Sequence, residues 1–180
     1  MVTGATGGVG SAAVSMLAAR GYRVIAVSGR PEHAEYVRSL GAAEVIRPAA
    51  LDLGSRPLEA ARFGGVIDNV GGDLLAGLIR HVGLWGQVAC IGMAAGSELA
   101  TSVFPLILRG VSLLGVSSAN CPMSLRQTLW NRLAVDWRPD RVHDQVRTID
   151  FEDLPTHFDA YLKGMVRGRT VVRIGRDSHP

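Results

Sequence analysis

The chain of 180 residues contains one lysine, two cysteines and no apolar run long enough to span a membrane. The lysine is Lys163, and the arginines that carry the rest of the basic charge are spread out, without the clustering typical of nucleic-acid binding. Cys90 and Cys121 show no spacing typical of a metal site, and Cys90, within the apolar run QVACIG, is expected to be buried. With no secretory signal either, we expect a cytoplasmic protein whose partners include neither nucleic acid nor membrane.

Glycine, in contrast, is concentrated near the start of the chain, in the segment TGATGGVG at residues 3–10. Residues 1–3 are expected to end a strand, and the alanine-rich run 11–20 to form a helix that Gly21 caps. A strand, a glycine turn and a helix N-terminus together make a diphosphate site, because the backbone approaches the ligand and free N–H groups point at it. An ordinary tight turn is the alternative for such a segment taken alone.

The run GYRVIAVSGR favours a dinucleotide site, because it is typical of the second buried strand of a βαβ unit. Where this strand ends, an NAD site usually carries an acidic residue that binds the ribose 2′-hydroxyl. Here Ser28, Gly29 and Arg30 offer a hydroxyl, open space and a guanidinium, which suit a 2′-phosphate, so NADP is predicted over NAD. The alternative is that Arg30 is a solvated surface residue and that Glu32 nearby is the acidic partner.

Strands and helices alternate over the rest of the first two thirds of the chain. This alternation predicts the α/β class with a doubly wound parallel sheet of the Rossmann type. The expected strands are 43–46, 66–70, 86–92 and 111–118, and the expected helices are 31–42, 73–81 and a short apolar one ending near 109. Arg47, after the third strand, is a candidate second cation near the adenine, from topology alone.

The pattern changes after residue 120. An amphipathic helix is expected over 124–137, with Leu125, Leu129 and Leu133 on a face that packs in the core. A strand, a helix and a last strand follow, at 145–149, 151–164 and 168–174. We therefore expect a nucleotide-binding domain at residues 1–135 and a C-terminal extension at 136–180.

Two enzyme families share the first motif. TGATGGVG satisfies the Thr-Gly-x-x-x-Gly-x-Gly pattern of short-chain dehydrogenases, which pair a catalytic tyrosine with a lysine four positions on. The position four before Lys163 is Asp159, so that catalytic pair is absent.

The segments VTGATGGVGSAAV, VIAVSGR, YVRSLGAAEVI, GGVIDNVGG, VACIGMAAG, PLILRGVSLLGVSS and GRTVVRI together resemble the zinc-independent medium-chain dehydrogenase/reductase superfamily. Within it they are most similar to the acryloyl-CoA reductase group, which includes NADPH:quinone oxidoreductases, and the similarity covers nearly the whole chain. The resemblance implies NADPH and no metal. The residues it implies for the cofactor are Thr6, Gly7, Gly8 and Val9 at the diphosphate, Ser28, Gly29 and Arg30 at the 2′-phosphate, Gly92 and Met93 at the nicotinamide, and Ser117 at the mouth of the cleft.

The resemblance also implies a reaction, in which NADPH gives a hydride to the β-carbon of an activated double bond and the α-carbon is protonated. The substrate would be a small enoyl-CoA or quinone-like molecule. No catalytic residue is assigned, because the histidines are scattered. Asp68 and Asn69 lie at a strand end and either contact the nicotinamide ribose or cap the turn.

Members of this superfamily begin with a β-rich domain that supplies most of the substrate pocket. Since this chain has no such domain and only three residues precede Gly4, a C-terminal fragment, a truncated gene product or a misplaced start is expected, with 136–180 belonging partly to the missing lobe. A non-catalytic NADP-binding module is the second hypothesis, and a structural protein without nucleotide is the third. The sixth strand, at 111–116, is a candidate edge for a homodimer.

Overall fold

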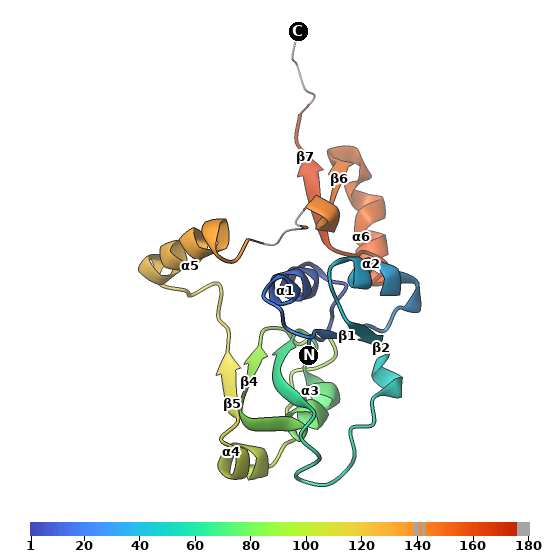
Figure 1. Ribbon diagram of the computed structural model, residues 1–180. Coiled ribbons are helices and arrows are strands. Elements are labelled where there is room, and N and C mark those ends of the chain that lie inside the picture. Colours follow the sequence, from blue (N-terminus) through green and yellow to red (C-terminus); the bar gives the residue numbers. More distant parts are fainter. Residues whose placement is uncertain (139–140, 142, 176–180) are drawn as a thin grey trace.

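A parallel β-sheet with flanking helices forms the body of the molecule, for which the computed structural model describes residues 1–138, 141 and 143–175 (Figure 1). The strands run in the order β2-β1-β3-β4-β5, and Val2, which bridges Ala26 and Ile67 in parallel fashion, stands between β1 and β3. The strands are β1 (Ile25–Val27), β2 (Glu44–Ile46), β3 (Phe63–Asp68), β4 (Val82–Cys90) and β5 (Ser112–Gly115). This order confirms the expected doubly wound, Rossmann-type sheet.

Helices connect all the neighbouring strands except β2 and β3, which are joined by a loop with a 3₁₀ turn at Pro48–Ala50, and their apolar side chains pack with those of the strands. One hydrophobic cluster gathers around α1 and α2 and includes Val14, Val37 and Ala26, while a second includes Leu78, Ile79 and residues of β3 and β4. The helices are α1 (Gly8–Ala19), α2 (Ala34–Ser39, after a 3₁₀ turn at Pro31–His33), α3 (Gly72–Ile79) and α4 (Phe104–Arg109). Alternation of strand and helix therefore buries both halves of the sheet, as the sequence pattern predicts.

The strand order changes direction at Val2, which lies between the two halves of the sheet. The chain first forms β1 and β2 on one side of Val2, and then crosses over to form β3, β4 and β5 on the other side. The carboxyl ends of the strands on either side of this switch point are where open α/β sheets bind ligands. The fold thus places the glycine loop, residues 4–10, at the carboxyl edge of the sheet, where a ligand is expected to bind.

Two strands begin several residues earlier than expected, and three end two or three residues earlier. β3 begins at Phe63 rather than residue 66, and β4 begins at Val82 rather than residue 86, while β3, β4 and β5 end at Asp68, Cys90 and Gly115 rather than at residues 70, 92 and 118. The register explains the earlier starts: Phe63 pairs with Val82 but Gly65 pairs with Gln87, so β4 bulges between these pairs, where Trp85 has a φ of 57°. The bulge contains Gly83 and Gly86 and interrupts the alternation of apolar and polar residues that is typical of a strand. The sequence pattern therefore indicates only the regular part of β4, after the bulge.

The C-terminal third begins with α5 (Met123–Val135), which stands apart from the sheet at the left of Figure 1. The expectation that its leucines pack in the core is wrong: Leu125 is 50% exposed and Leu129 is 46% exposed. Only Leu133 is half-buried, in a hollow that Met16 of α1 also lines. Periodicity shows that a helix face is apolar, but it does not show which surface covers that face.

A second, smaller sheet follows, in which β6 (Val146–Asp150) pairs in parallel with β7 (Arg169–Arg173). The helix α6 (Leu154–Leu162) connects them, and Figure 1 places all three elements beside α1 and α2. The predicted strand, helix and strand of the extension are thus present. In the described residues, no helix has both the length and the apolar composition needed to cross a bilayer.

Candidate functional site

The glycine loop after Thr3 is a tight turn that leads directly into α1. Gly4 has a φ of 56°, and its carbonyl accepts a hydrogen bond of 3.0 Å from the N–H of Gly7. A Cβ atom on Gly10 would collide with the backbone of Gly4, so this position has no room for a side chain. These glycines let the backbone fold closely enough to bring the N-terminus of α1 beside the ends of the strands.

The first turn of α1 offers donors without acceptors. The first bond into the helix runs from the N–H of Ser11 to the carbonyl of Gly7, at 2.9 Å, which leaves the amides of residues 8–10 without an intrahelical acceptor. The turn contains no acidic residue and no side chain caps it. This arrangement fits a diphosphate, because the amide donors and the positive end of the helix point to the same place.

The other residues predicted at the diphosphate lie in this turn as well. Thr6 is half-buried, and Val9 is 45% exposed.

The end of β1 carries the residues predicted to choose the nucleotide. Ser28 is buried and its Oγ accepts a hydrogen bond of 3.1 Å from the N–H of Arg30, while a Cβ on Gly29 would meet only open space. The Arg30 guanidinium is half-buried and donates to the carbonyl of Val166 at 3.4 Å. Within the described residues no carboxylate pairs with Arg30, and Glu32 is exposed. The structure therefore places a cation, and no paired acid, at this strand end.

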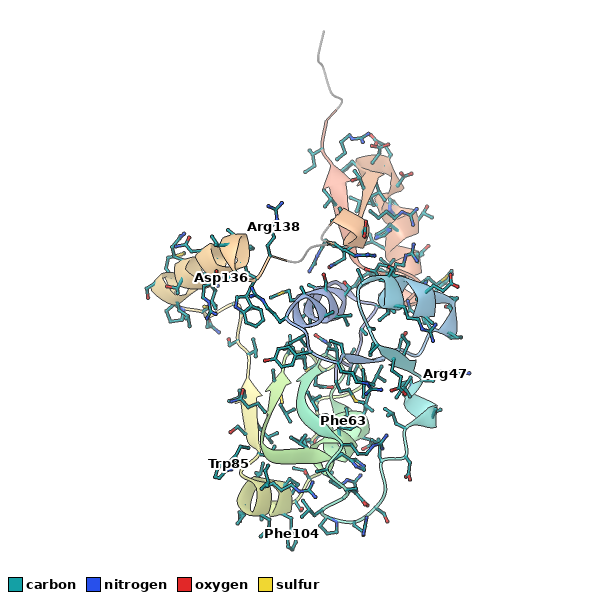
Figure 2. The ribbon with its side chains drawn as sticks, viewed as in Figure 1. Arg47, Phe63, Trp85, Phe104, Asp136 and Arg138 are labelled. Carbon is teal, nitrogen blue, oxygen red and sulfur yellow. The ribbon has the colours of Figure 1, made fainter. Side chains whose placement is uncertain are left out.

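Arg47, the second predicted cation, follows β2 on the same edge of the sheet. Its side chain is exposed and points outward, away from the glycine loop (Figure 2). The structure does not bring it together with Arg30, and its place near the adenine stays a prediction from topology.

A buried carboxylate organises the turn after β3. Asp68 is fully buried, and its two oxygens accept hydrogen bonds from the hydroxyl of Thr3 at 2.7 Å and from the N–H of Gly71 at 2.8 Å. Asn69 reaches back as well, since its Nδ2 donates to the carbonyl of Thr3 at 2.8 Å. Of the two alternatives for Asp68 and Asn69, this geometry favours capping of the turn.

The loops after β3 and β4 are in contact with each other. A Cβ on Gly92 would lie 2.5 Å from the carbonyl oxygen of Asn69, and the N–H of Ala95 donates to the carbonyl of Val70 at 2.8 Å. Met93 is 70% exposed on the outside of this contact. The predicted nicotinamide residues Gly92 and Met93 therefore lie at the carboxyl edge of the sheet, next to the turn that Asp68 holds.

Ser117 and Cys90 lie at the same edge. The N–H of Val116 donates to the carbonyl of Cys90 at 3.0 Å, which sets the exposed Ser117 just beyond the end of β4. Cys90 packs against the second hydrophobic cluster but is only half-buried, so the expected burial of this thiol is partial. Desolvation and, to a smaller extent, the nearby Asp68 raise the pKa of the Cys90 thiol, which favours its protonated form.

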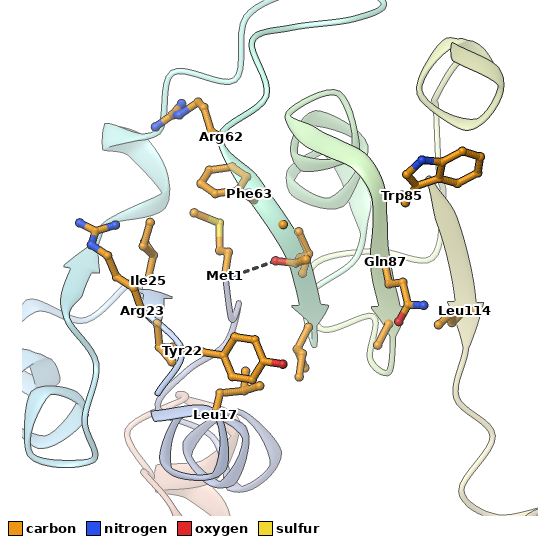
Figure 3. Close-up of a pocket in the computed structure, with 16 residues that line it drawn as sticks. Met1, Leu17, Tyr22, Arg23, Ile25, Arg62, Phe63, Trp85, Gln87 and Leu114 are labelled. Atoms are coloured by element: carbon orange, nitrogen blue, oxygen red, sulfur yellow. Dashed lines mark hydrogen bonds between the residues drawn. The ribbon is translucent and has the colours of Figure 1, made fainter. Parts of the chain in front are cut away.

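A cavity of about 690 Å³ lies along one face of the sheet (Figure 3). Met1, Tyr22 and Phe63 line it near the amino-terminal ends of the strands, and Ala89 and Leu114 line it further along β4 and β5. The amino group of Met1 donates to the carbonyl of Gly65 at 2.7 Å beside it. This cavity is therefore separate from the glycine loop and contains none of the predicted site residues.

Possible metal ligands and two of the histidines can also be placed in the part of the chain that the structure describes. The described residues contain no group of three His, Cys, Asp or Glu side chains placed to hold a metal ion. His81 is buried with its Nδ1 3.1 Å from the carbonyl of Ala60, and the Nε2 of His157 lies 2.8 Å from the hydroxyl of Thr170. These two rings serve local packing, away from the carboxyl edge.

Comparison with known proteins identifies the family to which this arrangement belongs. Residues 8–134 match the family model described as zinc-binding dehydrogenase. The chain belongs to this family. It is 42% identical over 175 residues to the acrylyl-CoA reductase AcuI of Ruegeria pomeroyi, covering 97% of this chain and 53% of AcuI. The chain therefore spans about half the length of the curated relatives it matches.

Solved structures of family members share the fold closely. The YhdH oxidoreductase of Salmonella enterica, crystallised in complex with NADP, is 41% identical and superposes with a TM-score of 0.91 over 97% of this chain and 53% of its own. The protein YhfP of Bacillus subtilis, crystallised with NAD bound, is 42% identical and gives a TM-score of 0.90 over 96% of this chain and 53% of its own. The chain thus has the nucleotide-binding fold of the medium-chain dehydrogenase/reductases.

One residue at the glycine loop escaped the sequence analysis. The guanidinium of Arg169, from β7, lies against Gly8, since a Cβ on Gly8 would come within 2.9 Å of the Arg169 Nη2. No local pattern indicates this contact, because it depends on how the C-terminal extension packs against α1.

Proposed function

We propose that this chain is the NADP-binding part of an oxidoreductase that transfers a hydride to an activated C=C bond of an enoyl-CoA or quinone-like substrate. The observation that carries the proposal is the combination at one edge of the sheet: amides at residues 8–10 without intrahelical acceptors, and Arg30 at the end of β1, which has no ion pair among the described residues. The first feature suits a diphosphate and the second suits a 2′-phosphate. The named relatives support the choice of reaction class.

The nucleotide must be chosen from this chain's own residues, because its relatives differ. YhdH of Salmonella enterica holds NADP, whereas YhfP of Bacillus subtilis holds NAD. Ser28 and Arg30 can donate to a phosphate, and the open space at Gly29 admits one. Without a carboxylate at this strand end to accept bonds from a 2′-hydroxyl, the site favours NADP.

The remaining predicted residues orient the nicotinamide end. The bound cofactor supplies the hydride, and the protein determines where it is delivered. Asp68 and Thr3 hold the turn that supports Gly92, and Met93 extends an apolar side chain beside it. No described residue is assigned as the proton donor, and we assign the proton to water or to a group outside this chain.

A non-catalytic NADP-binding module is the second candidate. It is favoured because no described residue at the carboxyl edge is assigned as a catalytic group. Both candidates bind NADPH, so binding alone does not separate them. Only the first oxidises NADPH when a suitable acceptor is present.

The test has two stages. Fluorescence titration first measures the binding of NADPH to the chain, and absence of binding would refute both candidates. Acryloyl-CoA and a simple benzoquinone are then added separately, with NADPH oxidation followed by absorbance. Oxidation above the rate of a matched Gly10→Val sample, in which the glycine loop is blocked, supports the reductase. Binding without oxidation supports the module.

A further inference from the structure

A carboxylate without a cation lies beneath the loops of the candidate site. Asp68, at the end of β3, is fully buried and forms no ion pair among the described residues. A buried charge destabilises the folded state unless a cation or hydrogen bonds compensate it. Here the compensation comes from hydrogen bonds, donated by the hydroxyl of Thr3 at 2.7 Å and by the N–H of Gly71 at 2.8 Å. The carboxylate is therefore tied to two separate parts of the chain.

The hydroxyl of Thr3 fixes the glycine loop to the turn after β3. Thr3 is also fully buried, and it directly precedes Gly4, the first residue of the glycine loop. Its Oγ1 donates to Asp68 and accepts a hydrogen bond of 2.9 Å from the N–H of Asn69. Its carbonyl accepts a further bond of 2.8 Å from the Nδ2 of Asn69. The start of the glycine loop therefore cannot shift against this turn without breaking hydrogen bonds in the interior.

The turn after β3 also sets the position of the nicotinamide loop, residues 91–96. The N–H groups of Ile91 and Gly92 donate to the carbonyl of Asp68, at 2.8 Å and 3.3 Å. A Cβ on Gly71 would lie 3.2 Å from the Cα of Met93, so the turn and the loop approach closely. Gly92 and Met93 are the residues predicted at the nicotinamide. One continuous series of contacts thus leads from the predicted diphosphate site to the predicted nicotinamide site.

We propose that Thr3 and Asp68 are positioning residues, which hold the nicotinamide loop in register with the glycine loop so that one dinucleotide is bound at both ends. This inference rests on the proposed function. Both side chains are fully buried, so they act through the two loops rather than by contact with the ligand. Contacts at the nicotinamide add most affinity when the loops are already in place, because ordering them on binding costs entropy.

A role confined to stability makes a different prediction. If the hydrogen bonds of Asp68 only support the turn, their loss lowers the melting temperature and leaves unchanged which parts of a nucleotide contribute to binding. If they position the nicotinamide loop, their loss removes the contribution of the nicotinamide ring and spares that of the phosphates.

The Thr3→Val variant tests the proposal, because valine keeps the shape of threonine and lacks the hydroxyl that Asp68 and Asn69 contact. Calorimetric titration compares NADPH with 2′-phospho-ADP-ribose, which has the same phosphates and sugars but no nicotinamide ring. The ratio of the two affinities measures what the ring contributes. We expect the wild type to favour NADPH by about fivefold or more, and Thr3→Val to bind both ligands alike, with the affinity for 2′-phospho-ADP-ribose within about twofold of the wild type.

Two control variants separate positioning from a general loss of stability. Thr3→Ser keeps the hydroxyl and should keep the wild-type ratio of affinities. Thr170→Val removes a hydroxyl that lies 2.8 Å from the Nε2 of His157 in the C-terminal extension, and it should leave the ratio unchanged as well. Both threonine-to-valine variants are expected to melt below the wild type, so only the ratio distinguishes them.

Other outcomes overturn the proposal in distinguishable ways. A wild type that binds NADPH and 2′-phospho-ADP-ribose equally would refute it, and so would a wild-type ratio in Thr3→Val. If Thr3→Val does not fold, Asp68→Asn decides, because its single acceptor oxygen cannot accept from both Thr3 and Gly71: a lower ratio supports the proposal, and the wild-type ratio refutes it. Failure of the wild type to bind either ligand would refute the proposed function itself.

Discussion

At the scale of residues, we expect single charged side chains to determine which anion each part of the proposed nucleotide site accepts. The Arg30 guanidinium donates to the carbonyl of Val166, and the Arg169 guanidinium lies against Gly8. Neither charge is neutralised by a carboxylate among the described residues. Three other arginines do form ion pairs within the described residues: Arg23 with Glu44 at 3.0 Å, Arg56 with Glu59 at 2.6 Å and Arg173 with Asp150 at 3.1 Å. Arg30 and Arg169 differ from these three in lying beside the carboxyl ends of the strands without a carboxylate.

The Arg56–Glu59 pair predicts a pH dependence of stability. Hydrogen bonds from the Arg56 guanidinium, and then from its N–H, lower the pKa of Glu59 from 4.5 to about 2. Because the pKa of Glu59 is lower in the folded state than in the unfolded state, the ionised Glu59 adds to the free energy of unfolding. This stabilisation is fully present above about pH 4.5 and is lost as the pH falls toward 2. Urea unfolding of Glu59→Gln should therefore show a lower free energy of unfolding than the wild type near neutral pH, with the gap closing in acid.

The control for this prediction is Glu98→Gln, which changes an exposed carboxylate that forms no ion pair among the described residues. It should follow the wild-type curve at every pH. A gap between Glu59→Gln and the wild type that stays constant from neutral pH to pH 2.5 would show that the pair does not titrate as described.

The sequence predicted the site residues that directly follow a strand of the sheet, but not a residue that is distant in the sequence and reaches the site through tertiary packing. Ser28 and Arg30 are adjacent to β1 in the chain, so recognising the strand was enough to place them at its carboxyl end. Arg169 reaches the same groove from β7, and only the packing of the extension against Thr6 and Gly8 puts it there. Arg47 was placed from topology alone, and since its side chain is exposed and points outward, its position near the adenine stays a prediction.

At the scale of elements, the glycine loop depends on the absence of one side chain. Gly10→Ala should weaken NADPH binding by about tenfold or more and lower the free energy of unfolding by about 1–3 kcal/mol, because the new methyl group meets backbone that cannot move aside freely. Denaturation and fluorescence titration measure the two effects. Gly64→Ala is the matched control, since a Cβ there meets nothing. Equal behaviour of the two variants would mean that the turn is not closely packed.

The type of most helices and strands could be predicted from the sequence, but the start of β4 and the exposure of α5 could not. Strand and helix alternate in the sequence with short connections, which was sufficient to predict the parallel sheet. The bulge at Trp85 interrupts the pattern of β4, and the apolar face of α5 gives no hint that Leu125 and Leu129 are exposed. Local patterns determine the type of an element, whereas its neighbours determine its limits and its burial.

At the scale of the whole molecule, β5 ends the sheet and pairs only with β4 among the described strands. Leu114 is 43% exposed and Val116 is 48% exposed on or beside this edge. An edge strand with apolar side chains is suited to pairing with its own copy across a two-fold axis. We predict a homodimer in sedimentation velocity, and a shift toward monomer for Leu114→Lys.

The control for the dimer is Leu162→Lys, which places the same charge on α6, where Leu162 is 84% exposed. It should leave the dimer intact. Dissociation by Leu162→Lys instead would move the interface to α6, and a monomeric wild type would rule out association through either surface.

The central claim is that this fold binds NADP through two separate anion sites, of which the one at Arg30 sets the preference over NAD. Calorimetric titration of NADPH and NADH into the wild type and into Arg30→Glu tests it most directly. We predict that the wild type binds NADPH at least about tenfold more tightly than NADH, and that the variant loses or reverses this preference. Equal affinities in the wild type, or an unchanged preference in the variant, would contradict the account.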